Sequence, residues 1–572
     1  MSDLLFKRNL CSFISHRCKP PDHSLLSVNI KCSYIDKGDC GNVDKMLNDT
    51  IPSKPIHNRT QNRRYNFNNM PESCMNSSVW RQSILAQIES LESCIKNQDS
   101  IDVLYKKFSE VVFAELDLYF KAKNTSKSTK RQYRHNKPYW SEDLKTLWEN
   151  MRDAENCFLK QSKTNCSNKK LRDQLRADYI KKRHIFDKAL RQAERKYNQG
   201  VLTDIEKVNT QNPRAFWDYI KKLGPRKNNT IPMKVKINDT MTINENDVLK
   251  KWQEDFSSLY NIPDDMEYDD LFKKRKTEEK FILENYPQNI NEFINQPISF
   301  QEVEQVINSL KINKACGFDG IPNEVVKNKD VVLYLWKFFN LLFNNNLMPS
   351  IWLKAIITPI PKGAKCDPHV PLNYRGISLL SCVSKAYSGI INKRITRYLD
   401  DTNFLVDEQN GFRKDRSCEE HIFSLHSMIQ TNIKSKKSVF GAFIDLEKAF
   451  DWVDRDLLFY KLLHNNINGN IYNAIKLLYT NTLSCMKINN LYTDWFQIFN
   501  GVRQGDTLSP TLFSFFINDL ASELKELGLG IDINGTKICI LLYADDMVLI
   551  ANSEAELQSM LNVMYQWCKN GV

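Results

Sequence analysis

ICILLYADDMVLIAN (538–552) contains two apolar runs that are separated by the acidic pair Asp545 and Asp546. Each run is rich in Ile, Leu and Val and is long enough for a short strand. A polar turn between two such runs is typical of a β-hairpin. We therefore expect an antiparallel strand pair that carries both aspartates at its connection.

The sequence upstream of this hairpin alternates strand-like and helical stretches. SVFGAFIDL (438–446) is a strand-like run that places Asp445 at its end, and AIITPIP (355–361) is another. Helical patterns cover 376–399 and 508–528. This alternation, with a tight hairpin at its end, predicts an α+β fold with a mostly antiparallel sheet and packed helices.

Strand ends of one sheet can converge, so Asp445, Asp545 and Asp546 are expected to lie together. Carboxylates without His or Cys beside them favour Mg²⁺ over zinc, and two such ions can serve a phosphoryl transfer. Each aspartate also has a plainer interpretation, because Asp is common in turns and at helix starts. Three further aspartates in DWVDRDLLFYKLL are best explained as a helix start, namely Asp451, Asp454 and Asp456.

Two loops carry candidate binding residues. GVRQGDTLSP (501–510) contains Gln504, which can donate and accept hydrogen bonds, and Gly505, which permits close approach of the backbone. Lys362 and Arg375 flank a Pro-containing loop and could grip a triphosphate. The alternatives are an ordinary loop before a helix and two ordinary surface cations.

Composition narrows the class of protein. The 572 residues contain 80 Lys and Arg against 68 Asp and Glu, a net charge of +12 that is compatible with a polyanionic partner. No apolar run approaches the length of a membrane span, and no secretory signal is evident at the start. The 15 cysteines form no C-x-x-C pair, which argues against a zinc ribbon and favours an intracellular protein with reduced thiols.

The amino-acid composition and the apolar pattern divide the chain into four parts. Residues 1–35 precede an Asn-rich stretch, 36–79, that is typical of a disordered linker. Residues 80–296 are predicted to be a helical, basic linker region, and 171–197 has clear helical spacing of apolar residues. Residues 121–137 carry seven Lys or Arg and no acid, which indicates either a template-binding surface or a solvated loop. Residues 297–572 form the last part.

The ordered motifs carry a resemblance. FIDLEKAFDWVD (443–454), GVRQGDTLSP (501–510) and LLYADDMVLIAN (541–552) resemble core motifs of the reverse transcriptases of non-LTR (LINE-type) retrotransposons. The upstream segments also look like finger and early palm segments of that family, and they are NKACGFDGIPNEVVK (313–327), ITPIPKG (357–363), NYRGISLLSCVSKAYSGIINKRI (373–395) and EQNGFRKDRSC (408–418). The resemblance covers about half of the chain.

The resemblance implies a right-hand polymerase with fingers and palm, acting as an RNA-directed DNA polymerase. Asp445, Asp545 and Asp546 would be catalytic and would hold two Mg²⁺ ions. Lys362, Arg375, Gln504 and Gly505 would contact the incoming nucleotide, and so would Phe450, as a bulky residue that excludes a ribose 2′-hydroxyl. Phe450 as a core aromatic is the alternative. The partners would be an RNA template, a DNA primer and dNTPs, with no membrane, and the location would be the nucleus.

The ends of the chain depart from the family pattern. PPDHSLLSVNIK (20–31), with Asp22 and His23, resembles the end of the endonuclease domain that precedes many such polymerases, or is a chance match. The chain stops soon after Asp546, before the segments that form the thumb in this family. We therefore expect a polymerase that is truncated at both ends and lacks a thumb. The alternatives are an inactive nucleic-acid-binding remnant and, less favoured because of Phe450, an RNA-dependent RNA polymerase.

Overall fold

A computed structural model describes residues 65, 71, 73–120, 139–163, 169–207, 231–237, 240–261, 270–285, 289–363, 366–533 and 535–570. The described residues form two compact units, one within 1–124 and 231–572 and the other within 125–230. Residues 1–35 lie outside the described residues, as do the basic stretch 121–137 and most of the predicted linker 36–79. The endonuclease-like match and the disorder of that linker therefore stay predictions.

The larger unit is α+β, as predicted from the sequence. Its α-helices are α2 (Ser78–Glu92), α3 (Gln98–Tyr119), α7 (Glu245–Tyr260), α8 (Asp270–Asn285), α9 (Glu292–Asn295), α10 (Phe300–Ser309), α11 (Asn323–Val326), α12 (Lys329–Asn345), α13 (Cys382–Asp401), α14 (Cys418–Lys434), α15 (Arg455–His464), α16 (Asn470–Tyr479), α17 (Ser509–Glu526) and α18 (Glu554–Lys569). Two short 3-10 helices are η2 (Ser350–Leu353) and η3 (Pro371–Asn373). The strands are β1 (Val235–Ile237), β2 (Thr240–Thr242), β3 (Lys354–Pro361), β4 (Tyr374–Leu379), β5 (Phe440–Asp445), β6 (Thr482–Ile488), β7 (Leu491–Tyr492), β8 (Phe496–Ile498), β9 (Ile531–Ile533), β10 (Thr536–Ile538), β11 (Ile540–Tyr543) and β12 (Asp546–Ala551).

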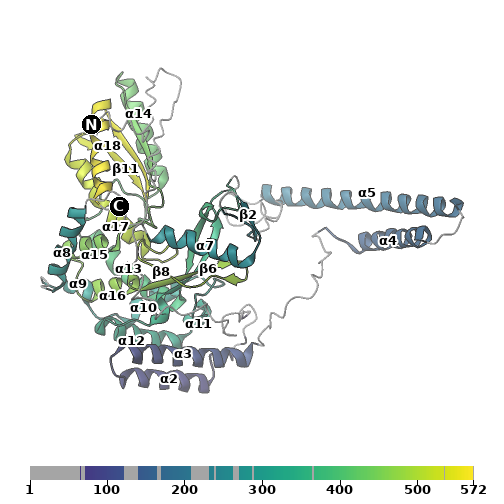
Figure 1. Cartoon of the computed structure of the whole chain (residues 1–572), viewed down its shortest axis with the longest axis horizontal. Helices are drawn as coiled ribbons and strands as arrows, with labels where there is room; N and C mark the ends of the chain where they lie inside the picture. The colour runs from purple at the N-terminus through teal and green to yellow at the C-terminus, as the bar shows by residue number, and fades with distance from the viewer. Residues whose placement is uncertain are drawn as a thin grey trace. The chain divides into compact units, whose positions relative to one another are not determined.

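A three-stranded antiparallel sheet contains the predicted hairpin. Its strand order is β11–β12–β5, so the hairpin β11–β12 is confirmed and β5 is its neighbour. One face of this sheet joins the main hydrophobic core with α17 and α18, and the other packs on α14 around Met428, Leu541 and Ile550. Figure 1 shows the sheet beside α14 and α18. Burial on both faces explains why these strands are apolar almost throughout.

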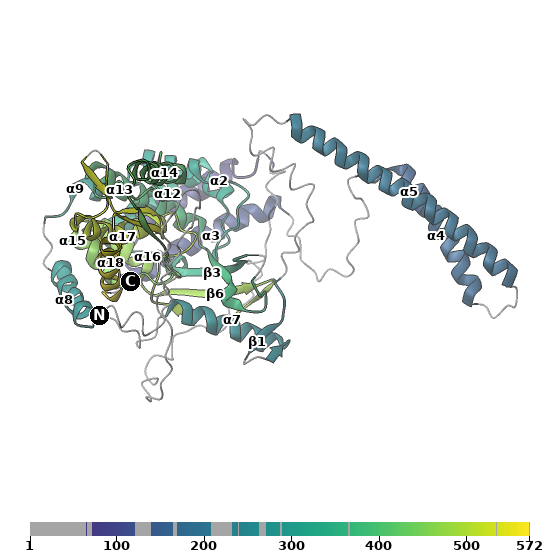
Figure 2. The same cartoon turned by 90° about the horizontal axis from the view of Figure 1, so that it is seen from above.

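A second sheet has the strand order β4–β3–β6–β7, and β8 is also paired to β6. All its pairs are antiparallel except β3–β6, which is parallel. Helix α7 covers one face through Trp252 and Phe256, which are buried against residues of β3, β4 and β6. Figure 2 shows α7 along β3 and β6.

The helix predicted over 376–399 is wrong at its start, because the first part of that stretch is β4 and the helix α13 begins only at Cys382. In β4, Tyr374, Gly376 and Ser378 are buried while the residues between them are more exposed, which is the period of a strand. A Cβ at Gly376 would lie 2.8 Å from the Phe256 ring, so the glycine allows α7 to pack closely here. The helix predicted over 508–528 is confirmed as α17.

Helices α2 and α3 belong to the same hydrophobic core as β5, β11, β12 and α17. Phe108 of α3 stacks on Tyr334 of α12 with ring centroids 4.3 Å apart, and Trp80 of α2 is fully buried. Figure 1 shows α2 and α3 running beside α12. The structure thus groups α2 and α3 with residues beyond 297, whereas the sequence suggested a separate linker region from 80 to 296.

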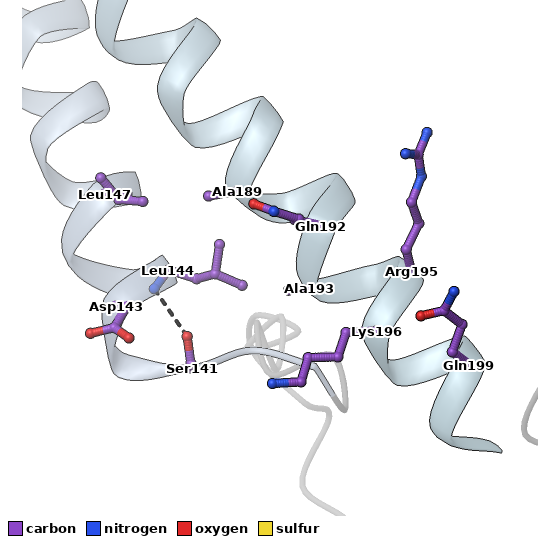
Figure 3. A pocket seen from close by; sticks show the side chains of 10 residues that line it. All are labelled: Ser141, Asp143, Leu144, Leu147, Ala189, Gln192, Ala193, Arg195, Lys196 and Gln199. Carbon is purple, nitrogen blue, oxygen red and sulfur yellow. Dashed lines mark hydrogen bonds between the residues drawn. The ribbon is translucent and has the colours of Figure 1, made fainter. Parts of the chain in front are cut away.

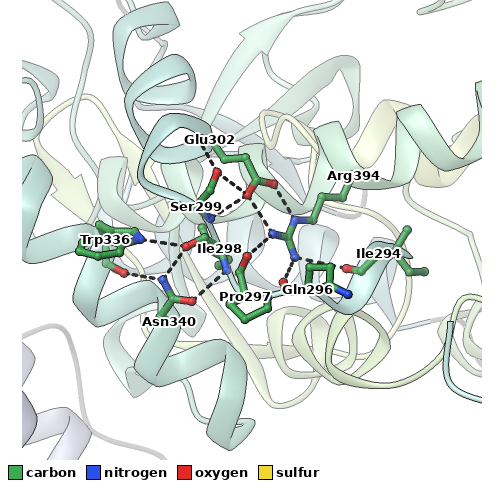
Figure 4. Close-up of polar contacts among 9 residues, drawn as sticks. All are labelled: Ile294, Gln296, Pro297, Ile298, Ser299, Glu302, Trp336, Asn340 and Arg394. Carbon is green, nitrogen blue, oxygen red and sulfur yellow. Dashed lines mark hydrogen bonds and ion pairs between the residues drawn. The ribbon is translucent and has the colours of Figure 1, made fainter. Parts of the chain in front are cut away.

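Arg394 of α13 fastens the chain that leads into α10. Its guanidinium makes two hydrogen bonds to the Glu302 carboxylate, at 2.7 and 2.9 Å, and donates to the carbonyl oxygens of Ile294, Gln296 and Pro297. Figure 4 shows Arg394 at the centre of this network. Glu302 also completes a capping box with Ser299 at the start of α10. The network therefore defines where α10 begins.

The smaller unit contains two described helices, α4 (Glu142–Lys163) and α5 (Lys169–Lys207), and α5 confirms the helix predicted over 171–197. The helices meet through aromatic pairs such as Phe158 with Tyr179, whose ring centroids are 6.4 Å apart. A groove of about 620 Å³ between them is lined by Leu144, Ala189 and Arg195, among others (Figure 3). None of the site residues predicted from the sequence lines this groove.

Within the part of the chain that the structure describes, no helix combines the length and the apolar character needed to cross a bilayer.

Candidate active site

The register of the three-stranded sheet brings two of the predicted aspartates together. Asp445, the last residue of β5, is the direct partner of Asp546, the first residue of β12. Asp546 in turn pairs with Tyr543 of β11, so Asp545 lies in the two-residue turn between these strands. Residues that are 100 positions apart in the sequence therefore meet at one end of one sheet, as expected.

The turn that carries Asp545 is held by a buried glutamine. Ala544 has a left-handed backbone with φ of 62°, which an alanine adopts at a cost. The Gln409 side-chain oxygen accepts hydrogen bonds from the backbone N–H of Ala544, at 3.1 Å, and of Gly411, at 2.8 Å. A Cβ at Gly411 would lie 2.2 Å from the Ala544 nitrogen, so only glycine fits against the turn. The segment 408–411 thus shapes the hairpin that places Asp545.

Charge accumulates at this end of the sheet. Burial raises the pKa of the Asp545 carboxyl, the charges of Asp546 and Asp445 raise it further, and Arg375 lowers it. Among the described residues, no three His, Cys, Asp or Glu side chains are grouped so that they could hold one metal ion. Mg²⁺ commonly takes one or two carboxylates and completes its shell with water and substrate phosphates. Asp445 and Asp546, which are direct partners in the β5–β12 register, fit that ion as a pair of carboxylates.

The two predicted triphosphate contacts lie on the β3–β4 hairpin. Lys362 follows β3 directly, and its backbone N–H donates to the Asn373 carbonyl at 3.0 Å. Arg375 lies opposite Ile360 in the β3–β4 register, and both cations are exposed. Burial raises the pKa of Asp451 and of Asp545, and the charges of Lys362 and Arg375 respectively oppose part of that rise. Both cations therefore lie on the β3–β4 hairpin, near enough for their charges to act on these two carboxyls.

Phe450 is half-buried beside this site. Its ring stacks on Phe513 of α17, with centroids 4.6 Å apart, and meets the edge of Phe412 at 6.1 Å. Its backbone oxygen accepts a hydrogen bond from the Val502 N–H at 2.8 Å. The ring is thus packed against Phe513 and Phe412 and is exposed in part. This arrangement is compatible with a nucleotide contact and with a core aromatic.

The loop before α17 lies against β4. The Gln504 carbonyl accepts a hydrogen bond from the Ser378 N–H at 2.8 Å. Gly505 has a φ of 118°, and a Cβ there would lie 2.8 Å from the Ser378 oxygen. Both the backbone angle and the close approach require glycine at this position. The loop and the β3–β4 hairpin are therefore parts of one site.

Two buried arginines support the same loop, and neither forms an ion pair with a carboxylate of the described residues. Arg455 donates to the carbonyl oxygens of Gly501, Tyr479 and Ile498, and burial lowers its pKa to about 9. Arg503 lies 5.8 Å from the Tyr479 ring centroid on the same ring that Arg455 faces. Burial lowers the pKa of Arg503 as well. These cations fix the backbone that presents Gln504.

Asp451 is not part of a helix start, so that interpretation of the sequence was wrong for this residue. Helix α15 begins at Arg455, and its cap is Asp454, whose carboxylate accepts from the Leu457 N–H at 3.0 Å. Asp451 is instead buried, and its Oδ1 accepts a hydrogen bond from Gln504 Nε2 at 2.9 Å. The sequence offers one signal for a place of Asp451 in the site, because Asp451 directly follows Phe450, a predicted nucleotide contact.

The predicted site residues lie in a part of the chain that matches a known protein family. Residues 360–571 match the family model described as reverse transcriptase (RNA-dependent DNA polymerase). Residues 360–571 are a reverse transcriptase domain. The reverse transcriptase domain contains all three predicted catalytic aspartates and all five predicted nucleotide contacts.

Curated proteins that are similar to this chain come from mobile elements. The chain is 30% identical over 289 residues to a probable RNA-directed DNA polymerase from transposon BS of Drosophila melanogaster, covering 48% of this chain and 31% of that protein. It is 25% identical over 315 residues to the RNA-directed DNA polymerase from mobile element jockey of the same species, covering 52% and 34%. It is 27% identical over 269 residues to a Pol polyprotein from the type-1 retrotransposable element R2 of Nasonia vitripennis, covering 47% and 25%.

These relatives confirm the resemblance to the LINE-type reverse transcriptases, which are RNA-directed DNA polymerases. The chain spans about a third or less of the length of each of these relatives. Two solved telomerase structures, from Candida albicans and Candida tropicalis, match 38% of this chain at TM-scores of 0.28 and 0.29. The two matches cover 40% and 48% of the telomerase chains, at 11% and 14% sequence identity. This likeness is too low to bear on the fold.

Proposed function

We propose that this chain is an RNA-directed DNA polymerase of a LINE-type retrotransposon. The observation that carries the proposal is the pairing of Asp445 with Asp546 across two strands, with Asp545 in the adjoining turn. In this proposal the three-stranded sheet with α17 and α18 is the palm, and the β3–β4 hairpin belongs to the fingers. The partners are an RNA template, a DNA primer and dNTPs, and the place of action is the nucleus.

The reaction is the attack of a primer 3′-hydroxyl on the α-phosphorus of a dNTP, with pyrophosphate as the leaving group. Asp445, Asp545 and Asp546 would hold two Mg²⁺ ions, which supply positive charge for the attacking and leaving oxygens. Lys362 and Arg375 bind the triphosphate from the opposite side of the site. The protein's part in catalysis is to orient primer and nucleotide and to fix these charges in advance.

In this proposal Phe450 is the residue that makes the polymerase prefer deoxynucleotides. A half-buried ring that is stacked on Phe513 has little freedom to move away from a substrate. A ribose 2′-hydroxyl next to such a ring would lose its hydrogen bonds to water, so deoxynucleotides are favoured. An RNA-dependent RNA polymerase would require the opposite preference, and a comparison of dNTP with NTP incorporation separates the two.

The test is dNTP incorporation on a primed RNA template with Mg²⁺, by the chain and by the variants Asp445→Asn and Asp545→Asn. The matched control is Asp401→Asn, which removes an exposed carboxylate that pairs with Arg397 on α13. We expect incorporation by the wild type and by the control, and a loss of at least about a hundredfold in the two site variants. Equal rates in wild type and site variants would overturn the proposed site.

The alternative function is a nucleic-acid-binding remnant without catalysis. It would bind the primed template in a salt-dependent way through its basic surfaces and incorporate nothing. Binding without incorporation by the wild type, at any Mg²⁺ concentration, would favour that alternative over the polymerase.

A further inference from the structure

Asp451 is a buried carboxylate that neither the fold nor the three catalytic aspartates accounts for. It is 7% exposed, and among the described residues its one hydrogen-bond donor is the Gln504 amide. A buried carboxylate with one partner is costly, because it gives up several hydrogen bonds to water. Gly501 passes directly over the Asp451 backbone, where a Cβ would lie 2.5 Å from its carbonyl oxygen. The backbone of Asp451 is therefore closely packed, and its side chain is buried with the bond to Gln504.

The surroundings of Asp451 are those of the predicted nucleotide pocket. Phe450 precedes it, Gln504 is bonded to it, and the charge of Lys362 acts on it. Lys448 acts on it in the same direction, and the pKa of Tyr260 on α7 is raised by burial and by the charge of Asp451. Burial raises the pKa of Asp451 to about 6, so the carboxyl is ionised at neutral pH. It thus presents acceptors and no donor to Gln504.

An acceptor-only neighbour decides which way an amide points. A glutamine side chain carries an oxygen that accepts and an NH₂ group that donates, and the two ends are alike in shape. An ionised Asp451 can bond only the NH₂ end, which leaves the Gln504 Oε1 atom available as an acceptor for another group. Without this carboxylate the amide would be free to rotate and offer either end.

We propose that Asp451 is a positioning residue that turns the Gln504 amide so that its oxygen accepts a hydrogen bond from the sugar of the incoming nucleotide. The inference rests on the proposed function. The 2′-deoxyribose of a bound dNTP has one hydroxyl that can donate, the 3′-hydroxyl, and Phe450 is the neighbouring residue assigned to the sugar. The expected consequence is discrimination between dNTPs and 2′,3′-dideoxynucleotides, which lack that donor.

The experiment measures kcat and KM for insertion of dTTP and of ddTTP on one primed RNA template. The variants are Asp451→Asn, Gln504→Ala and the double variant, because asparagine keeps the size of Asp451 but can donate as well as accept. The matched control is Asp454→Asn, an Asp-to-Asn change at the cap of α15 three residues away. The melting temperature of each variant is measured alongside.

We expect the wild type to prefer dTTP, and Asp451→Asn to reduce the ratio of kcat/KM for dTTP to that for ddTTP by about three- to tenfold, the range of one hydrogen bond. Gln504→Ala and the double variant should show the same reduced ratio, whereas Asp454→Asn keeps the wild-type ratio. A ratio that is unchanged in Asp451→Asn, whatever its melting temperature, would overturn the positioning role alone. Failure of the wild type to insert either nucleotide would overturn the proposed function, and this inference with it.

Discussion

Asp445 and Asp546 lie directly opposite each other in the β5–β12 pair, so two like charges face each other across neighbouring strands. Such a pair destabilises a sheet by a few tenths to about 1 kcal/mol. The sheet tolerates this because apolar residues on the same strands are fully buried, among them Ala442 and Leu549. In the proposed function, the same two carboxylates are ligands for a divalent cation, and a bound cation would remove their repulsion.

The first prediction concerns this pair and Mg²⁺. In EDTA, Asp546→Asn should melt about 1–2 °C above the wild type, because it removes the repulsion with Asp445. Added Mg²⁺ should raise the melting temperature of the wild type more than that of the variant, because the ion binds the folded carboxylate pair. Differential scanning fluorimetry in EDTA and in Mg²⁺ gives both values. A variant that melts below the wild type in EDTA would contradict the prediction.

A second prediction follows from the position of Asp451. Its pKa is raised to about 6, so the carboxyl is ionised above that pH and becomes protonated as the pH falls through it. A protonated Asp451 can donate and no longer selects the NH₂ end of Gln504. The preference for dTTP over ddTTP should therefore be constant from pH 7 to 8 and decline below about pH 6. Asp451→Asn should show a flat, low preference over the same range, and parallel profiles for both proteins would refute the link.

The third prediction concerns the Arg394 network at the start of α10. Arg394→Ala removes bonds to Glu302 and to three carbonyl oxygens, and it leaves a partly buried carboxylate without its partner. The free energy of unfolding should fall by about 3 kcal/mol or more. Arg397→Ala on the same helix is the control, because its pair with Asp401 is exposed and should contribute less than about 1 kcal/mol. Urea titrations of both variants measure the difference.

The fourth prediction tests whether α3 is an integral part of the larger unit. The Tyr105 hydroxyl donates to the buried Asp319 carboxylate at 2.6 Å. Tyr105→Phe should lower the free energy of unfolding by about 2 kcal/mol, because the carboxylate loses a donor that water does not replace. Tyr565→Phe, at an exposed position of α18, should change it by less than about 0.5 kcal/mol. A wild-type-like transition in Tyr105→Phe would mean that α3 is not coupled to that unit.

The fifth prediction concerns the turn that carries Asp545. Gln409→Leu removes the acceptor for the Ala544 and Gly411 N–H groups while keeping a similar size. The turn should loosen, and kcat for dNTP insertion should fall at least about tenfold with a smaller change in KM, because the substrate contacts remain. The control is Gln566→Leu, at an exposed position of α18, which should keep both constants. A change in KM alone would place Gln409 in substrate binding instead.

Local pattern predicted much of this architecture. The apolar runs around Asp545 and before Asp445 predicted the hairpin and its neighbouring strand, because strands buried on both faces must be apolar along their length. The helical spacing in 171–197 and 508–528 predicted α5 and α17 for a similar reason. The stretch 376–399 misled, because the strand β4 and the helix α13 are both apolar and follow each other within three residues.

Three features depended on contacts between distant residues. The register that sets Asp445 opposite Asp546, the bond between Asp451 and Gln504, and the burial of α2 and α3 join segments that lie 53 to more than 200 positions apart. Composition alone placed α2 and α3 in a linker region. Their buried residues pack against α12, and no local pattern reveals that contact.

The sequence by itself determined which residues could do the chemistry, because acidity, size and hydrogen-bonding capacity belong to each side chain alone. It also determined the strands and helices whose apolar period is local. Only the tertiary structure decided which carboxylate faces which neighbour. Asp451 and Asp454 are identical in chemistry and three residues apart, yet one caps a helix and the other is buried against Gln504. That difference arises from packing, since burial removes water and leaves each carboxylate with the donor that the fold brings to it.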